Sequence, residues 1–402
     1  TPENPAATVE PTQGEPTAEP TDEGIMPANV MPVQANVELQ YRIVHLDCGR
    51  EYFTKDWIIA LINEMAEAGY NQLQLAFGNG GFRFYLNNMA VGSYSHEQVM
   101  GALEAGNKHY NIYGDGENGP TNSEWITYNQ SVNALTQTEM DTIIKHAQSK
   151  GIEIVPMLNT PGHMHAVLTA MSELGISGNL QVSGKPGCLN LENTAAVSFT
   201  KELVSKYVKY FADNGCKFFN FAMDEYSSFD TNFFIYANSL IAYANTNTNL
   251  ITPRVFNDAL SNSNIKSGFI EGTQVCCWDS IKNTDGYSVI NTSHDFYYVS
   301  TNEAWNLNES TVNGEGYTFV GDYKENTWIE HAKKFNNNTF LYKKTQSTIN
   351  SPVGSMFCIW CNTPGKNDET QIAQQIRMIL RVIGARMQNS NEYKTTDVLV
   401  EG

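Results

Sequence analysis

Short apolar runs rich in β-branched and aromatic residues alternate with amphipathic helical stretches from Tyr41 onward, and this alternation constrains the fold more than any other feature of the chain. In the first cycle, a strand-like run at 41–49 precedes a helical stretch at 54–69. Thr54 can cap that helix and Gly69 can end it. Because strands that alternate with helices form parallel βα units, the sequence predicts an α/β fold with a parallel sheet.

Eight strands are predicted, at 41–49, 70–78, 152–163, 216–225, 254–260, 272–280, 287–299 and 353–362. The clearest helices are at 54–69, 136–151, 194–215 and 368–387. Eight βα units in about 360 residues predict a (β/α)8 TIM barrel with loop insertions, of which the longest is the polar segment at 84–135. A doubly wound open sheet is the alternative, but no glycine-rich phosphate loop follows the first strand.

The first 35 residues differ in composition from the rest of the chain. Seven of the fourteen prolines precede residue 33, threonine and glutamate are frequent, and large apolar side chains are almost missing. Such a segment buries too little apolar surface to offset the entropy of ordering it. We therefore predict a disordered, acidic Pro/Thr/Glu-rich linker at 1–35, of the kind that joins a catalytic domain to a surface anchor or to flanking modules, and one catalytic domain at 36–402.

The charge and the cysteines exclude several classes of partner. A net charge of −18 repels nucleic acid and anionic membranes, and the longest apolar runs are too short to insert across a bilayer. The seven cysteines include adjacent Cys276 and Cys277 and the closely spaced Cys358 and Cys361, all in apolar, strand-like runs. Buried thiols are therefore favoured over a zinc site, and we predict neither a metal nor a cofactor.

Polar and aromatic residues follow the predicted strands where a barrel would gather its active-site groups, at the C-terminal strand ends. In chain order they are Asp47, Arg50, Asn79, Arg83, Asn159, His163, Asp224, Glu225, Asn257, Asp258, Trp278, Asp279, Asp295, Tyr297, Trp360 and Asn362. This mixture of carboxylates, amides, arginines and aromatic rings suits a sugar. Aromatic faces stack on the apolar side of a pyranose ring, and the polar groups bind its hydroxyls.

Two adjacent carboxylates, Asp224 and Glu225, end an apolar run that begins at Cys216. An apolar flank and a neighbouring like charge both raise the pKa of a carboxyl group. A glycosidase needs a carboxylic acid that keeps its proton near neutral pH. If the strand has ended, so that both side chains face the cavity, Glu225 is predicted to have a raised pKa and to act as that acid. The alternative is a charged pair that opens a solvated loop.

Seven motifs occur together in one order: LDCGREYF, GNGGFRF, LNTPGHM, NFAMDEY, QVCCWDS, HDFYYV and GSMFCIWCN. In this order and spacing, from Tyr41 to Met387, the chain resembles the family 20 glycoside hydrolases, the β-N-acetylhexosaminidases. It is most similar to the bacterial surface exo-β-N-acetylglucosaminidase branch. The resemblance implies a TIM barrel that removes terminal β-linked N-acetylglucosamine or N-acetylgalactosamine from glycans with retention of configuration.

The resemblance also implies a substrate-assisted mechanism, in which the acetamido oxygen of the sugar attacks C1 and forms an oxazolinium intermediate. Glu225 is then expected to protonate the leaving oxygen and later to activate water. Asp224 is expected to orient the acetamido N–H and to balance the developing positive charge. Tyr297 is expected to hydrogen-bond the acetamido oxygen, although the neighbouring tyrosine of the FYY run is an alternative.

Further residues are expected to bind the sugar by the same resemblance. Arg50 would hold ring hydroxyls, Trp278 and Trp360 would wall the acetamido pocket and the sugar floor, and His163 would support the acid. The remaining substrate-binding candidates are Asn159, Asp258, Asp295 and Asn362. Each has a structural alternative, since a buried tryptophan or histidine can be an ordinary core residue and an arginine can serve an ion pair.

The chain departs from the family pattern at four positions. Asn159 stands where many members carry an aspartate, and Asn362 stands where an acid is common. Gly80 lacks the side chain expected there, and Phe256 replaces a tryptophan of some members. Because a neutral amide at 362 repels an anion less than a carboxylate does, one hypothesis is a 6-sulfo-N-acetylglucosaminidase.

Two other functions stay open from the sequence. A lacto-N-biosidase uses the same residues but releases a disaccharide and needs a wider pocket. A non-catalytic glycan-binding adhesin is disfavoured because a binding protein does not need the proton donor of the Asp224–Glu225 pair. In each case the expected partner is an oligosaccharide or glycoconjugate, and a secreted or cell-surface bacterial protein with flanking modules is predicted.

Overall fold

The computed structural model describes residues 38–115, 133–247, 251–261, 267–300, 337–342, 345–362, 364–365 and 367–390 of the 402-residue chain. The linker predicted at 1–35 lies outside these residues.

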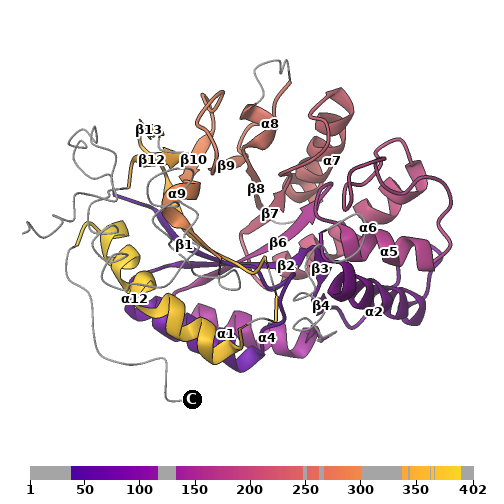
Figure 1. Cartoon of the computed structure of the whole chain (residues 1–402), viewed down its shortest axis with the longest axis horizontal. Coiled ribbons are helices and arrows are strands. Elements are labelled where there is room, and N and C mark those ends of the chain that lie inside the picture. Colours follow the sequence, from indigo (N-terminus) through magenta and orange to yellow (C-terminus); the bar gives the residue numbers. More distant parts are fainter. Residues whose placement is uncertain are drawn as a thin grey trace, which may run out of the picture.

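Eight parallel strands form a closed barrel, which confirms the predicted TIM barrel (Figure 1). Around the barrel each strand pairs with the next in the order β1, β14, β10, β9, β8, β7, β6 and β2, and pairing of β1 with β2 closes it. The strands are β1 (Tyr41–Leu46), β2 (Gln72–Asn79), β6 (Glu153–Thr160), β7 (Phe218–Ala222), β8 (Thr252–Phe256), β9 (Gln274–Cys277), β10 (Ser288–Asn291) and β14 (Gly354–Trp360).

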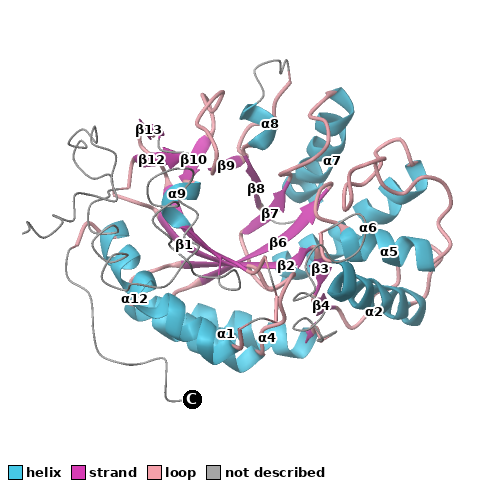
Figure 2. Ribbon diagram, viewed as in Figure 1, coloured by secondary structure: helices cyan, strands magenta, loops and turns pink. Residues whose placement is uncertain are grey.

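Helices cover the outside of the barrel, and Figure 2 shows α12, α1 and α4 side by side along one flank. Thr54 caps α1 as predicted, because its side chain accepts a hydrogen bond from the backbone N–H of Trp57. The helices of the βα units are α1 (Lys55–Glu67), α4 (Gln137–Ser149), α5 (His165–Glu173), α6 (Thr194–Asp213), α7 (Thr231–Asn247), α8 (Asp258–Ser261) and α12 (Glu369–Met387).

An 18-residue helix, α2 (His96–Tyr113), lies in the segment that the sequence predicts as a polar insertion. It begins after Ser95, which forms a capping box with Gln98. It packs so closely on α5 that a Cβ at Gly106 would lie 2.2 Å from the carbonyl oxygen of Ala166. The short strands near it in sequence are β3 (Gly81–Phe82), β4 (Phe84–Tyr85) and β5 (Leu135–Thr136).

The second half of the barrel is less regular than the first. The run predicted as one strand at 287–299 divides into β10, α9 (His294–Tyr297) and β11 (Tyr298–Ser300), and β11 pairs with the end of β14. Residues 278–287, which join β9 to β10, contain no helix. A hairpin of β12 (Thr339–Tyr342) and β13 (Thr345–Thr348) precedes β14.

The apolar core has two parts. The larger lies between the strands and the surrounding helices, and the smaller fills the barrel interior beneath the C-terminal strand ends. The interior part consists of Ile43, Ala76, Met157, Ala222, Phe256, Cys276, Ile290, Tyr298, Met356 and Cys358. All seven cysteines are buried free thiols. Among the described residues, no helix has the length and apolar character needed to cross a membrane.

Candidate active site

A cavity of about 170 Å³ opens at the C-terminal ends of the barrel strands. Eight of the sixteen strand-end residues that the sequence singles out line it, together with three residues of α9 and β11. The lining consists of Arg50, Asn79, His163, Asp224, Glu225, Trp278, His294, Tyr298, Val299, Trp360 and Asn362. Half of the strand-end residues that the sequence singles out therefore converge on one pocket, at the end of the barrel where the topology places them.

Asp224 and Glu225 both reach this pocket because the backbone turns as soon as β7 ends. Ala222, Met223 and Glu225 have φ values of 61°, 63° and 47°. These left-handed conformations, costly for residues other than glycine, break the strand alternation that would point neighbours to opposite faces. A Cβ at Gly162 would lie 2.6 Å from the carbonyl oxygen of Asp224, so this loop needs glycine to approach the turn.

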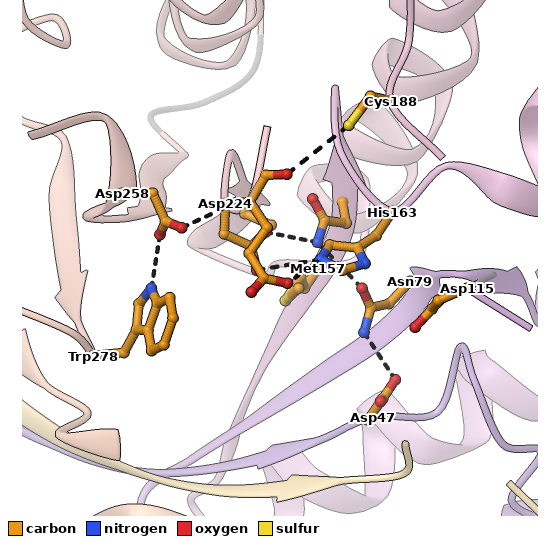
Figure 3. Close-up of polar contacts among 12 residues, drawn as sticks. Asp47, Asn79, Asp115, Met157, His163, Cys188, Asp224, Asp258 and Trp278 are labelled. Carbon is orange, nitrogen blue, oxygen red and sulfur yellow. Dashed lines mark hydrogen bonds and ion pairs between the residues drawn. The ribbon is translucent and has the colours of Figure 1, made fainter. Parts of the chain in front are cut away.

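Asp224 is 9% exposed, and its carboxylate accepts a hydrogen bond from the side-chain amide of Asn159. Asn159 Nδ2 donates to Asp224 Oδ1 at 2.7 Å and to Asn79 Oδ1 at 3.2 Å, and Asn79 Nδ2 donates to Asp47 at 3.1 Å (Figure 3). Burial raises the pKa of Asp224 and the charge of Glu225 adds to the effect, whereas His163 and the Asn159 hydrogen bond oppose it.

The Glu225 side chain is 56% exposed and contacts His163, whose Nε2 lies 3.0 Å from Glu225 Oε2. This hydrogen bond outweighs burial and lowers the pKa of Glu225, so the prediction that its pKa is raised is wrong for the free protein. Burial opposes protonation of His163, but the bond to Glu225 and the charge of Asp224 raise the pKa of His163 to about 9. The raised carboxyl pKa of the pair belongs to Asp224.

Arg50 is fixed by two aspartates. Its Nη1 lies 3.0 Å from Asp47 Oδ2, and its Nη2 lies 3.1 Å from Asp115 Oδ2. The sequence reasoning missed Asp115, which follows α2 in the insertion; the capping box of α2 was the available signal for that helix. Arg83, a strand-end candidate, is buried and donates to the backbone oxygens of Gly49 and Arg50, so it holds the Arg50 loop in place.

Aromatic rings wall the pocket on two sides. Trp278 Nε1 donates to Asp258 Oδ2 at 2.7 Å, and its ring stacks on Tyr298 with centroids 6.3 Å apart. Trp360 packs on His45, with centroids 4.3 Å apart, and lies edge-on to Tyr298. These contacts orient the two tryptophans that the sequence singles out.

Asp258 lies behind the pocket wall. Its Oδ1 accepts from the backbone N–H of Glu225 at 2.9 Å while its Oδ2 accepts from Trp278 (Figure 3). Burial and the charge of Asp224 raise the pKa of Asp258 to about 8. Asp258 therefore connects the turn at 222–225 to the aromatic wall. Asn159 connects Asp224 to Asn79 in the same way.

The tyrosine of the pocket is Tyr298, which corrects the assignment of Tyr297. The two neighbours pack in different parts of the core. Tyr297 packs into the outer core, where burial raises its pKa to about 12. Tyr298 faces the barrel interior and the cavity. The side chain of Asp295 lies outside the described residues.

The other polar contacts near the pocket concern a possible metal site, a connection between loops and one further lining residue. Among the described residues, His163, Asp224 and Glu225 each offer a ligand atom within 4.8 Å of the others, so these three could hold a metal ion. Asn257 donates to Asp279 at 2.8 Å and its side-chain oxygen accepts from the backbone N–H of Trp278, so these two strand-end residues connect loops. His294, in the HDFYYV motif but not singled out, also lines the cavity.

Comparisons with known proteins indicate the family to which the chain belongs. The sequence model for the catalytic domain of glycosyl hydrolase family 20 matches residues 39–376. A solved catalytic module of the pneumococcal exo-β-D-N-acetylglucosaminidase StrH is similar, with a TM-score of 0.67 and 27% identity, covering 88% of this chain and 84% of that one. The β-N-acetylhexosaminidase of Bacteroides fragilis NCTC 9343 shares the fold, with a TM-score of 0.63 and 16% identity, covering 90% of this chain and 68% of that one.

A curated relative matches over a shorter stretch. A segment of 100 residues, 24% of this chain, is 33% identical to the lacto-N-biosidase of Bifidobacterium bifidum. The match spans only 8% of that protein.

Proposed function

Because the chain belongs to glycosyl hydrolase family 20, we propose that it is a retaining, exo-acting β-N-acetylhexosaminidase that removes terminal β-linked N-acetylglucosamine or N-acetylgalactosamine from glycans. The observation that carries this proposal is that two adjacent carboxylates, Asp224 and Glu225, converge on one pocket walled by Trp278 and Trp360. The carboxylates serve acid–base chemistry and charge stabilisation, and the indole faces suit the apolar side of a sugar ring.

The proposed reaction is substrate-assisted. The acetamido oxygen of the bound sugar attacks C1 as the bond between C1 and the leaving oxygen breaks, and Glu225 gives its proton to that oxygen. Glu225 then removes a proton from water, whose oxygen attacks C1 of the oxazolinium ion and restores the acetamido group. Two displacements at C1 retain the β configuration.

Asp224 and Tyr298 would act on the acetamido group. The hydrogen bond from Asn159 and the low exposure of Asp224 support a fixed carboxylate that accepts from the acetamido N–H and balances the oxazolinium charge. Tyr298 borders the same cavity and would donate its O–H to the attacking acetamido oxygen. This arrangement favours the transition state because the groups are oriented before the substrate binds.

Glu225 needs a proton that its lowered pKa does not favour in the free protein. We propose that substrate binding supplies the change. A leaving group that covers the half-exposed Glu225 removes water, and a buried pair of neutral groups is then favoured over a buried imidazolium and carboxylate. The proton that His163 loses as it becomes neutral would reach Glu225 through solvent, and His163 would keep its Nε2 proton in the 3.0 Å hydrogen bond to Glu225 Oε2.

The remaining lining residues would hold the rest of the sugar. Trp360 would form the floor, with the guanidinium carbon of Arg50 at 6.0 Å from its ring centroid. Arg50 would donate to ring hydroxyls, and Asn362 at the exposed rim would bind an outer hydroxyl. A volume of about 170 Å³ falls below the roughly 300–1,000 Å³ of typical ligand pockets, which supports release of a single sugar.

Turnover of aryl β-N-acetylglucosaminides tests the proposal. We expect the wild-type enzyme to hydrolyse them, Glu225→Gln to lose activity mainly on substrates with poor leaving groups, and Asp224→Asn to slow every substrate. An activated leaving group depends less on protonation, whereas all substrates form the same cation. Near-normal turnover by both variants would overturn the assignment.

A lacto-N-biosidase is the second candidate, favoured by the 33% identity over 100 residues to the Bifidobacterium enzyme. Release of a disaccharide from milk-type glycans, without hydrolysis of simple N-acetylglucosaminides, would favour it.

Sulfated and plain N-acetylglucosaminides compared side by side test the 6-sulfate hypothesis at Asn362. The likeness to StrH supports an extracytoplasmic location and flanking modules as further parts of the proposal.

A further inference from the structure

We propose that Asp115 is a positioning residue, which fixes Arg50 against the sugar and, through Arg50, orients the His163–Glu225 pair. This inference rests on the proposed function. Asp115 belongs to none of the strand-end motifs, because it follows α2 in the long insertion. Figure 3 places it beside His163, on the side away from Asp258.

The contacts of Arg50 show how Asp115 would act on it. Asp115 Oδ2 accepts from Arg50 Nε at 3.2 Å and from Nη2 at 3.1 Å, and Asp47 accepts from Nη1 at 3.0 Å. Carboxylates on two edges fix the plane of a guanidinium group. Together with the contact to His163, the described residues engage four of its five N–H groups, which leaves one Nη1 N–H for a sugar hydroxyl.

Arg50 also connects Asp115 to the acid. Arg50 Nη2 lies 3.3 Å from His163 Nδ1, and a guanidinium can only donate. In the neutral His163 that the proposed substrate complex requires, Nδ1 therefore accepts, and the ring proton stands on Nε2, which donates to Glu225 Oε2 at 3.0 Å. The orientation set by Asp115 thus passes through two hydrogen bonds to the proton donor.

The fold holds Asp115 in this place through α2. Asn107 of α2 accepts from the backbone N–H of Phe82 and donates to the Phe82 carbonyl oxygen, each at 2.7 Å. Tyr110 Oη, one turn before the helix ends, donates to Asp115 Oδ1 at 3.0 Å. A Cβ at Gly80 would lie 2.4 Å from Tyr110 Oη, so the glycine that departs from the family pattern makes room for this hydroxyl.

The test is Asp115→Asn in the full chain, assayed on an aryl β-N-acetylglucosaminide. We expect kcat/KM to fall about 100-fold, as a misplaced positioning group does, with the melting temperature little changed. The control is Glu104→Gln, which neutralises an exposed carboxylate on α2 and should keep wild-type kinetics. In an Arg50→Ala background, Asp115→Asn should add little further loss, because both changes remove one interaction.

Two further measurements separate positioning from a merely structural role. Acetate should partly restore turnover to Asp115→Ala, since the site of Asp115 is 40% exposed and accessible to a small carboxylate. If Asp115→Asn fails to fold, Tyr110→Phe should lower kcat/KM in the same direction. Kinetics of Asp115→Asn equal to those of Glu104→Gln, or losses that multiply in the Arg50→Ala background, would overturn the inference. Absence of wild-type turnover would instead overturn the proposed function.

Discussion

At the scale of single residues, Asp224 shows how opposing effects set one pKa. Burial and the neighbouring Glu225 raise the pKa of Asp224, and the hydrogen bond from Asn159 lowers it. The proposed mechanism uses the ionised form. Activity should therefore be lost as the pH falls through the pKa of Asp224, and this acid limb should lie above that of an ordinary aspartate.

Asn159→Leu should move the acid limb of the pH–activity profile to higher pH. The substitution removes the amide that donates to Asp224 Oδ1 at 2.7 Å while keeping a side chain of similar size. Without this bond the charged carboxylate is less favoured, so its pKa rises. The pH dependence of kcat/KM measures the shift, and an unchanged limb, or one at lower pH, would contradict this account of Asp224.

Tyr298→Phe and Tyr297→Phe form a matched pair that removes one hydroxyl from either side of the same backbone. Tyr298→Phe should lower kcat by about 10²- to 10³-fold if its O–H stabilises the attacking acetamido oxygen. Tyr297→Phe should leave kinetics near wild type, because that side chain packs in the outer core. Steady-state kinetics on one aryl substrate decide between them, and the reverse pattern would restore the assignment to Tyr297.

Sequence reasoning has a clear limit at this scale. The apolar flank correctly indicates an unusual carboxyl environment, but it does not reveal that His163, 62 positions earlier, contacts Glu225 and reverses the pKa shift. Likewise, the FYY run specifies a tyrosine but not which one faces inward. A short helix, α9, interrupts the predicted strand there and changes the alternation of faces.

At the scale of elements, the packing of α1 against α12 includes a buried ion pair between Glu64 and Arg381. Arg381→Met should lower the free energy of unfolding by about 3–5 kcal/mol, because it leaves the buried Glu64 carboxylate without this partner. The double variant Glu64→Leu/Arg381→Met should recover most of that loss, since well-packed apolar side chains can replace a buried pair.

Urea unfolding measures both variants. Lys209→Met is the control, because it removes an exposed ion pair with Asp213 on α6 and should change the free energy of unfolding little. A double variant no more stable than Arg381→Met alone would show that packing, not the unpaired charge, accounts for the loss.

The insertion shows which elements a sequence conceals. In α2 the buried positions include Val99, Leu103 and Tyr110, but glycine, asparagine and charged residues between them weaken the apolar periodicity. The helix is stabilised by its fit to α5 and β3, which depends on distant segments. Its capping box at Ser95 was visible, whereas the contact between Asp115 and Arg50 was not.

At the scale of the whole molecule, the barrel could be predicted because each strand and most helices carry a local pattern, and because parallel βα units leave few topologies. The closure of β1 between β2 and β14 follows from that topology. The convergence of the strand-end residues follows as well, since one end of a barrel brings together side chains far apart in sequence. The missing helix between β9 and β10 has no comparable signal.

The central claim is that the sugar's own acetamido group attacks C1 in this pocket. The most direct measurement compares kcat/KM for aryl β-glucosaminides whose N-acetyl group carries zero, one, two or three fluorine atoms. Fluorine withdraws electron density from the attacking oxygen, so we predict a steep and continuous fall across the series. Equal rates across the series, or equally fast hydrolysis of the aryl β-glucoside that has a 2-hydroxyl instead, would contradict the claim.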